Sequence, residues 1–233
     1  MFRYWHEEKI LSRDFSLFFE NFKVHHPERI PSFFSKEEVL RIESSIKRTS
    51  KTGKRNFAMV LLASRLGLRA SDIAELKFQD IDWDNHTIHI TMQKTGKGIV
   101  LPLLPEVGNA IIDYLRNGRP ASSLSNVFLS TRAPYEAGSR QMIGSAINEI
   151  IVKAGVDVHM KHHGPHSLRH SLASAMLTEG STMPVISEAL GHKSTDTTMV
   201  YLRIDVQALL KCANPVPAVE SGFYIQRGGA FYE

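Results

Sequence analysis

Apolar side chains recur at helical spacing over most of the chain, and this pattern predicts a mainly helical fold. The spacing is clear in EVGNAIIDYL, SAINEIIVKAG, SLASAML, PVISEAL and DVQALL. Residues 86–93, HTIHITMQ, instead alternate as a strand does, and a glycine-bearing turn joins them to GIVLPL. NVFLS at 126–130 is a further candidate strand. The expected class is α+β, mainly helical, with a small antiparallel β-hairpin or sheet.

The chain is expected to divide near residue 30. Residues 1–22 predict one amphipathic helix, and the two prolines of VHHPERIPSF predict a connector after it. Ser35 and Glu38 have the spacing of a capping box, which predicts a helix over KEEVLRIESSIKR. The polar, basic segment SKTGKR at 50–55 is interpreted as a linker, and the apolar NFAMVLLASRLG after it as a buried helix.

Composition narrows the class of protein without naming a function. The 233 residues are 42% hydrophobic and 22% charged, with 28 Lys and Arg against 24 Asp and Glu. The net charge of +4 is a mild excess that suits contact with nucleic acid through one face. The single cysteine, Cys212, excludes an intramolecular disulfide framework. No apolar run approaches the roughly 20 residues of a membrane span, so we expect a cytoplasmic protein.

Three short segments carry candidate chemistry. In GLRASDIAEL, Gly67 ends one helix, Ser71 is expected to cap the next, and Arg69 lies in the joint between them. In HSLRH, His166 and Arg169 share a helix face, and an imidazole beside a guanidinium suits phosphate binding. The turn QKTGKG adds two lysines. Each of these residues alone also fits an ordinary capping or solvated role.

Five histidines within twelve positions suggest a zinc site as a rival interpretation. The segment contains neither HExxH nor a CxxC pair, and no acidic residue lies inside the cluster. We therefore expect no metal and no cofactor. The histidines are His159, His162, His163, His166 and His170.

Together and in order, four segments resemble the tyrosine recombinase (phage integrase) family. They are GLRASDI, QKTGKGIVLPL, HSLRH and LGHKSTDTTMVYLR. The resemblance covers roughly residues 33–205, the catalytic domain of that family. It implies a remnant helix and linker of a truncated core-binding domain at 1–32, a catalytic domain at 33–213 and a C-terminal arm at 214–233.

The resemblance also implies a site-specific recombinase or integrase that cleaves and rejoins DNA through a 3′-phosphotyrosyl bond. Arg69 and Arg169 would clamp the phosphate, and Lys94 would protonate the leaving 5′-oxygen. The residues alone do not separate Lys94 from Lys97 as that acid. The remaining roles fall to His166 in proton transfer, His192 as a hydrogen-bond donor to the phosphate, and Tyr201 as the nucleophile.

The expected partners are double-stranded DNA, other protomers assembled on DNA, and accessory DNA-bending proteins, with a monomer in free solution. In a bacterium the protein would be associated with the nucleoid. Two alternatives stay open: DNA relaxation like that of a type IB topoisomerase, and a decayed DNA-binding protein without catalysis. The residues expected to contact DNA are Lys47, Arg48, Lys51, Lys54, Arg55 and Lys97.

Overall fold

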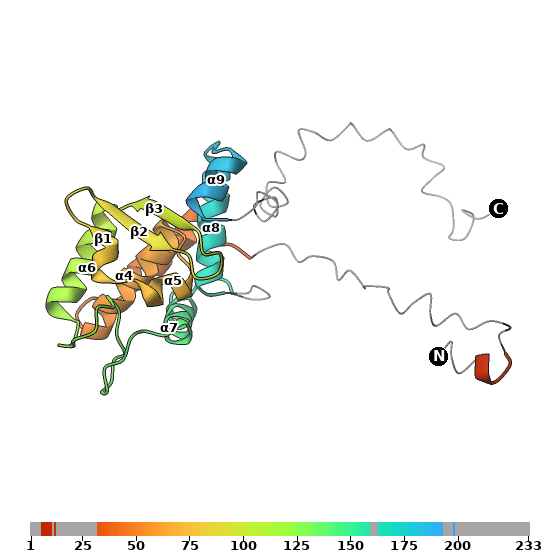
Figure 1. Ribbon diagram of the computed structural model, residues 1–233, viewed down its shortest axis with the longest axis horizontal. Coiled ribbons are helices and arrows are strands. Elements are labelled where there is room, and N and C mark those ends of the chain that lie inside the picture. Colours follow the sequence, from red (N-terminus) through yellow and green to blue (C-terminus); the bar gives the residue numbers. More distant parts are fainter. Residues whose placement is uncertain (1–5, 11, 13–31, 159–162, 193–197, 199–233) are drawn as a thin grey trace. The chain divides into compact units, whose positions relative to one another are not determined.

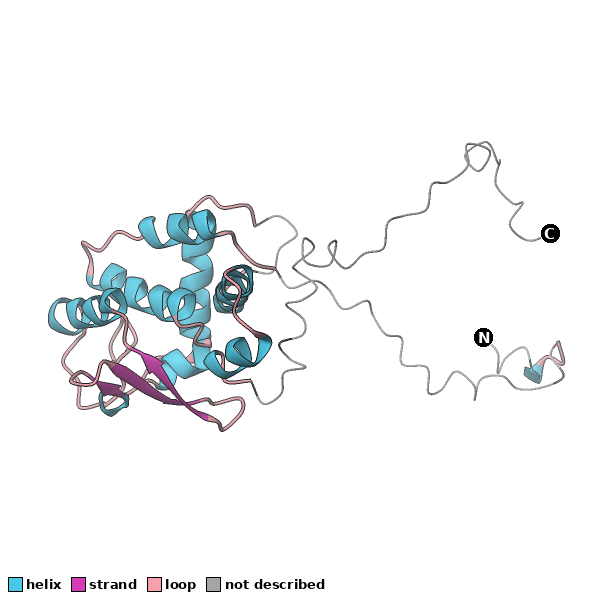
Figure 2. Cartoon of the chain, turned by 90° about the horizontal axis from the view of Figure 1, so that it is seen from above, coloured by secondary structure: helices cyan, strands magenta, loops and turns pink. Residues whose placement is uncertain are grey.

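The computed structural model describes residues 6–10, 12, 32–158, 163–192 and 198. The chain divides into two compact units, residues 1–30 and 31–233. In the described part of the second unit, the helices lie mainly on one side of a small sheet (Figures 1 and 2), which confirms the mainly helical α+β class. The expected helix in DVQALL and the C-terminal arm lie outside the described residues, as does most of the expected helix at 1–22.

Along the second unit, three α-helices precede the strands of the sheet and four α-helices follow them, among the described residues. The sheet comprises β1 (Ile81–Asp82), β2 (Thr87–Thr91) and β3 (Gly98–Pro102). A short 3₁₀ helix, η1 (Phe78–Asp80), precedes β1. The helices are α3 (Lys36–Ser44), α4 (Lys51–Arg65), α5 (Ala70–Glu75), α6 (Pro105–Asn117), α7 (Arg140–Lys153), α8 (Pro165–Thr178) and α9 (Met183–Ala189).

The sheet is antiparallel in the order β1-β2-β3, and the predicted hairpin is its β2-β3 pair. Ile88 and Ile90 face the core while the residues between them face solvent, as the alternation predicts. The two-residue strand β1 is an addition that the alternation does not reveal. The expected strand at 126–130 is wrong, because this segment forms only isolated bridges, Asn126 with Lys77 and Leu129 with Ala137.

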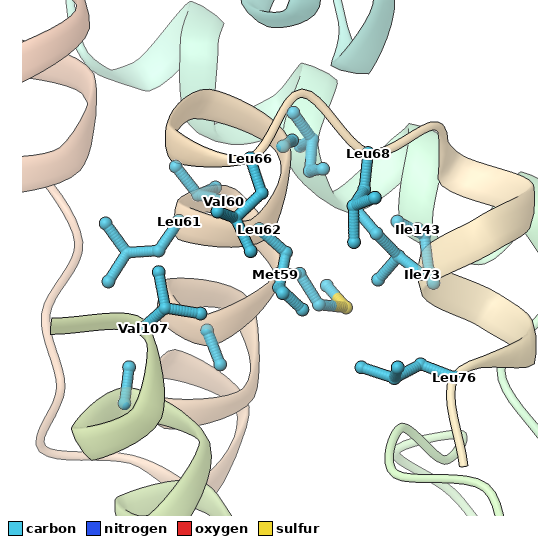
Figure 3. Close-up of a cluster of buried hydrophobic side chains, with 14 of the residues drawn as sticks. Met59, Val60, Leu61, Leu62, Leu66, Leu68, Ile73, Leu76, Val107 and Ile143 are labelled. Carbon is cyan, nitrogen blue, oxygen red and sulfur yellow. The ribbon is translucent and has the colours of Figure 1, made fainter. Parts of the chain in front are cut away.

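Helix α4 is the central element of the core. Residues 58–64 are buried on every side of the helix, and α4 packs against α6, α7 and α8 (Figure 3). A helix that is apolar all round belongs in an interior, which explains the unbroken run AMVLLA. Among the described residues, no helix is both long and apolar enough to cross a membrane.

Two helices begin at other residues than the sequence predicts. SKTGKR is not a linker: Ser50 is the N-cap of α4, its Oγ accepts the Gly53 N–H at 3.0 Å, and the helix begins at Lys51. Ser71 does not cap α5, because the N-cap position is Arg69 and the helix begins at Ala70. Both shifts matter for function, since they fix where Arg69 and the lysines near residue 50 lie.

Candidate active site

Two helix ends place Arg69 and His192. After α4 ends, Gly67 turns the chain with a φ of +63°, and Arg69 follows as the N-cap of α5. After α9 ends, Gly191 turns it with a φ of +60°. The N–H groups of Gly191 and His192 then donate to the carbonyls of Glu188 and Ser187, each at 2.9 Å. This is a Schellman motif, in which the left-handed glycine determines where the next residue lies.

Arg169 of α8 connects these two helix ends. Its side chain is buried, with 1% of the residue exposed. Nη1 donates to the Gly67 carbonyl at 2.6 Å, and Nη2 donates to the Leu190 carbonyl. Carbonyls at the ends of helices carry the negative pole of the helix dipole, so they suit a cation. The two charge-assisted hydrogen bonds offset the cost of burying the guanidinium.

Met92, at the start of the hairpin turn, contacts residues at both helix ends. It is fully buried, and its Sδ accepts a hydrogen bond from Arg69 Nη1 at 3.5 Å. On its other side it packs so closely on Gly191 that a Cβ there would lie 2.9 Å from Met92 Cε. Lys94 follows Met92 by two residues on the exposed turn. The hairpin therefore carries Lys94 to the joint that holds Arg69.

Asp72 is a site residue that the sequence analysis missed. Its buried carboxylate accepts the Gln93 N–H at 2.9 Å, and its Oδ2 lies 3.9 Å from Arg69 Nη1. Oδ2 has no hydrogen-bond partner among the described residues. Asp72 thus links the arginine to the strand end before Lys94 and acts as a positioning residue. The signal was present in the sequence, as an acid three residues after Arg69 on a short helix.

The histidines lie in the same cluster of cations. His166, exposed on the first turn of α8, contacts the ring of His170 edge-on at a centroid distance of 4.3 Å. Burial lowers the pKa of His192 to about 4, and the charges of Arg169, Arg69, His166 and Lys94 act in the same direction. Partial desolvation, followed by Arg169, Arg69 and Lys94, lowers the pKa of His166. The His192 imidazole is therefore neutral at pH 7, and the same two effects favour the neutral form of His166.

The structure thus brings together five of the six residues predicted for catalysis, namely Arg69, Lys94, His166, Arg169 and His192. Tyr201 lies outside the described residues, and so do His159 and His162. The described part of the chain ends near the site with Thr198, which is buried and lies 2.7 Å from His192 Nδ1 through its Oγ1. In the ranges that the structure describes, no three His, Cys, Asp or Glu side chains form a group that could hold a metal ion.

The residues predicted to contact DNA include exposed cations, one ion-paired lysine and one buried arginine. Lys97 is exposed on the hairpin turn, and Lys47, Arg48 and Lys51 are exposed around the start of α4. Lys54 is bound to Asp113, with Nζ 2.7 Å from Oδ1.

Arg55 is buried and does not lie on an exposed basic face with Lys47, Arg48 and Lys51. Only 5% of the residue is exposed, and Nη1 donates to the Leu129 carbonyl at 3.1 Å.

Comparison with known proteins adds relatives over the same part of the chain. A family model described as "Phage integrase family" matches residues 32–208. Two Sinorhizobium fredii (strain NBRC 101917 / NGR234) proteins named as integrase/recombinase, y4rA and y4gC, are 39% and 34% identical to this chain. The matches cover 81% and 82% of this chain. They span 45% of y4rA, less than half its length, and 98% of y4gC.

Among solved structures, the crystal structure of XerA recombinase is similar, with a TM-score of 0.65 and 25% sequence identity. The match covers 79% of this chain and 65% of that one.

Proposed function

Because the chain belongs to the phage integrase family, we propose that it is a site-specific DNA recombinase that cleaves and rejoins DNA through a 3′-phosphotyrosyl intermediate. The observation that carries the proposal is the meeting of Arg69, Lys94, Arg169 and two histidines from four separate elements. The four elements lie far apart in the sequence, and the glycine turns at Gly67 and Gly191 determine where Arg69 and His192 lie.

The electrostatics of the cluster favour an anionic substrate. Burial, and after it the neighbouring positive charges, lower the pKa values of His166 and His192, while one buried carboxylate, Asp72, lies near Arg69. Such a cluster is unfavourable by itself and becomes favourable when a phosphate neutralises it. A phosphodiester also gains charge as the fifth oxygen approaches phosphorus, so the same cations stabilise the transition state more than the ground state.

The proposed reaction needs no external energy source. The Tyr201 oxygen attacks phosphorus, and the bond from phosphorus to the 5′-oxygen breaks. Neutral His166 takes the phenol proton, which is needed because a free phenol has a pKa of about 10. Lys94 gives a proton to the departing 5′-oxygen. Attack by a 5′-hydroxyl on the phosphotyrosyl bond then reverses these steps and rejoins the DNA.

The two arginines have different tasks in this scheme. Two backbone carbonyls fix the Arg169 guanidinium, so it meets the phosphate with little further loss of side-chain entropy. Arg69 is held by Asp72 and Met92. His192, neutral and bonded to Thr198, contributes one hydrogen bond to a non-bridging oxygen. The pair of guanidinium groups supplies the charge that a divalent metal supplies in other phosphoryl-transfer enzymes.

The wider proposal follows the sequence analysis. The substrate is double-stranded DNA in the cytoplasm, in bacteria at the nucleoid, and protomers assemble on it, with accessory DNA-bending proteins as further partners. The free chain is monomeric. The domain limits at residues 32 and 213 belong to the same proposal.

A nicked duplex that carries the recombination site tests the reaction, because loss of the short 5′ fragment traps the covalent adduct. We expect an adduct that survives denaturing gel electrophoresis and forms equally well with EDTA. Exchange between two duplexes is the second measurement. Relaxation of supercoiled DNA without exchange would identify a type IB topoisomerase activity instead. Binding without any adduct would identify a DNA-binding protein without catalysis.

A further inference from the structure

A second basic site lies at the opposite end of α4 from Arg69. The fifteen residues of α4 separate the two ends by about 22 Å, at the usual rise of 1.5 Å per residue. A cavity of about 70 Å³ opens there, which exceeds the space that one water molecule needs. Arg55 and Tyr114 form its buried side, and the exposed Lys51, Thr52 and Thr131 stand at its rim.

Arg55 gives this cavity a buried positive charge. Its guanidinium donates to the Leu129 carbonyl and to Asn56 Oδ1, both of which are neutral acceptors. No carboxylate among the described residues forms an ion pair with it. A guanidinium so deeply buried is costly when its charge lacks a counterion. Burial accordingly lowers the pKa of Arg55.

The start of α4 adds a second source of positive potential. Ser50 accepts the Gly53 N–H, but the first N–H groups of any helix have no partner within it. The first turn of α4 contains no acidic residue, whereas the first turn of α3 contains Glu37 and Glu38. The positive pole of the α4 dipole is therefore left without the anion that usually complements it.

Acids close to this end of the helix do not neutralise it. Asp113 is bonded to Lys54 at 2.7 Å and to Asn117 Nδ2 at 2.7 Å. Its pKa is lowered first by the Lys54 hydrogen bond and then by that of Asn117. Lys51 is exposed, and no carboxylate in the described part of the chain forms an ion pair with it. The cavity thus combines a buried guanidinium, an exposed ammonium, a helix start and hydroxyl donors from Thr52, Thr131 and Tyr135.

We propose that this cavity, which we call the distal anion site (Lys51, Thr52, Arg55, Thr131 and Tyr135), binds a phosphate oxyanion. On the proposed function, the oxyanion is a phosphate of the DNA backbone. Phosphates of one strand advance about 3.4 Å along the duplex axis, so a site about 22 Å from the end of α4 near Arg69 would contact a different phosphate from the cleaved one. Contacts of this kind set the register of a protein on DNA.

Inorganic phosphate tests the chemistry without DNA. Titration of the ¹⁵N-labelled chain should shift the backbone amide signals of Lys51 and Thr52, and chloride at equal ionic strength should not shift them. Thr52→Glu should abolish the response, because its carboxylate occupies the site. This variant also places an acid on the first turn of α4, so its thermal midpoint should not fall, and loss of binding cannot be unfolding. Equal shifts in phosphate and chloride would overturn the proposal.

The salt dependence of DNA binding tests the source of the phosphate. For a random 30-base-pair duplex between 50 and 200 mM salt, each phosphate contact contributes about 0.9 to the slope of log K against log salt. Lys51→Gln should lower the slope by about 1. Lys36→Gln is the matched control, because Lys36 is also an exposed first residue of a helix with a serine N-cap. It should keep the wild-type slope.

The outcomes separate this proposal from the proposed function. If phosphate shifts the amide signals but Lys51→Gln leaves the slope of log K against log salt unchanged, the site binds free phosphate. That result would overturn the DNA contact. Equal slope losses in Lys51→Gln and Lys36→Gln would reduce the contact to general surface charge and overturn the site. A wild-type chain that forms no covalent adduct, yet shows the shifts and the slope change, would refute the recombinase and leave the distal anion site standing.

Discussion

Exchanging each clamp arginine for lysine should separate stability from catalysis. Arg169 donates to two backbone carbonyls at the ends of α4 and α9, whereas Arg69 contacts Met92 Sδ at 3.5 Å and Asp72 at 3.9 Å. One ammonium cannot bridge both carbonyls as the guanidinium fork does. Arg169→Lys should therefore weaken the fold, and Arg69→Lys should leave it nearly unchanged.

The expected magnitudes follow from these contacts. Leaving one buried carbonyl without its charged donor costs about 1–3 kcal/mol, so we expect Arg169→Lys to lower the free energy of unfolding by about 2 kcal/mol. For Arg69→Lys the loss should stay below about 1 kcal/mol, since the sulfur contact is weak and lysine keeps the positive charge beside the buried Asp72. Both variants should lose about 10²–10³ in cleavage rate, because each removes one set of preorganised donors.

Urea unfolding followed by circular dichroism measures the first quantity, and the rate of adduct formation on the nicked duplex measures the second. Rates must be taken at a temperature where both variants are folded. Equal stability losses in the two variants would refute the bridging role of Arg169. Cleavage near the wild-type rate in either variant would remove that arginine from the phosphate clamp.

Three further predictions concern single residues. Tyr201→Phe should keep the fold and DNA affinity but abolish the adduct; an adduct of normal yield would exclude Tyr201 as the nucleophile. The pKa of His192, about 4 in the folded chain and about 6.5 unfolded, means that the unfolded chain binds more protons between these values. His192 should therefore contribute a fall of up to about 3 kcal/mol in stability as pH drops from 6.5 to 4, and His192→Gln should remove this part of the fall in urea titrations. A parallel curve in that variant would contradict the assignment. Gly191→Ala should cost about 1–3 kcal/mol in unfolding free energy, because its φ of +60° is left-handed and its Cβ would press on Met92; an unchanged thermal midpoint would refute the tight packing.

Sequence patterns predicted the elements whose signals are local. The β2-β3 hairpin follows from alternation and a glycine turn, and the position of Arg69 in a joint follows from Gly67. The start of α4 was missed because lysines and a glycine resemble a linker, while its N-cap bond and the packing of α6 favour a helix. The burial of Arg55 was not predicted because its acceptor, the Leu129 carbonyl, lies 74 residues away in the sequence. A single sequence does not display such distant hydrogen bonds.

The same distinction applies to the site. Arg169 was identified from its spacing to His166, but nothing local indicates that it bonds the carbonyls of Gly67 and Leu190. The role of Asp72 likewise depends on the Gln93 N–H of a strand that the short helix meets only in the folded chain. Residue types were therefore predictable, and their supporting contacts were not.

The two hydrogen bonds from Arg169 to the carbonyls of Gly67 and Leu190 bear on the choice of an inactive variant for trapping a DNA complex. Removing this arginine releases the ends of α4 and α9 together, and with them the backbone next to Arg69 and His192. A DNA complex of such a variant would show a distorted backbone next to Arg69 and His192 rather than the arrangement of the wild-type site. Tyr201→Phe, or an exchange at Arg69, is the better choice for crystallisation, because the substrate then meets an intact Arg169 bridge.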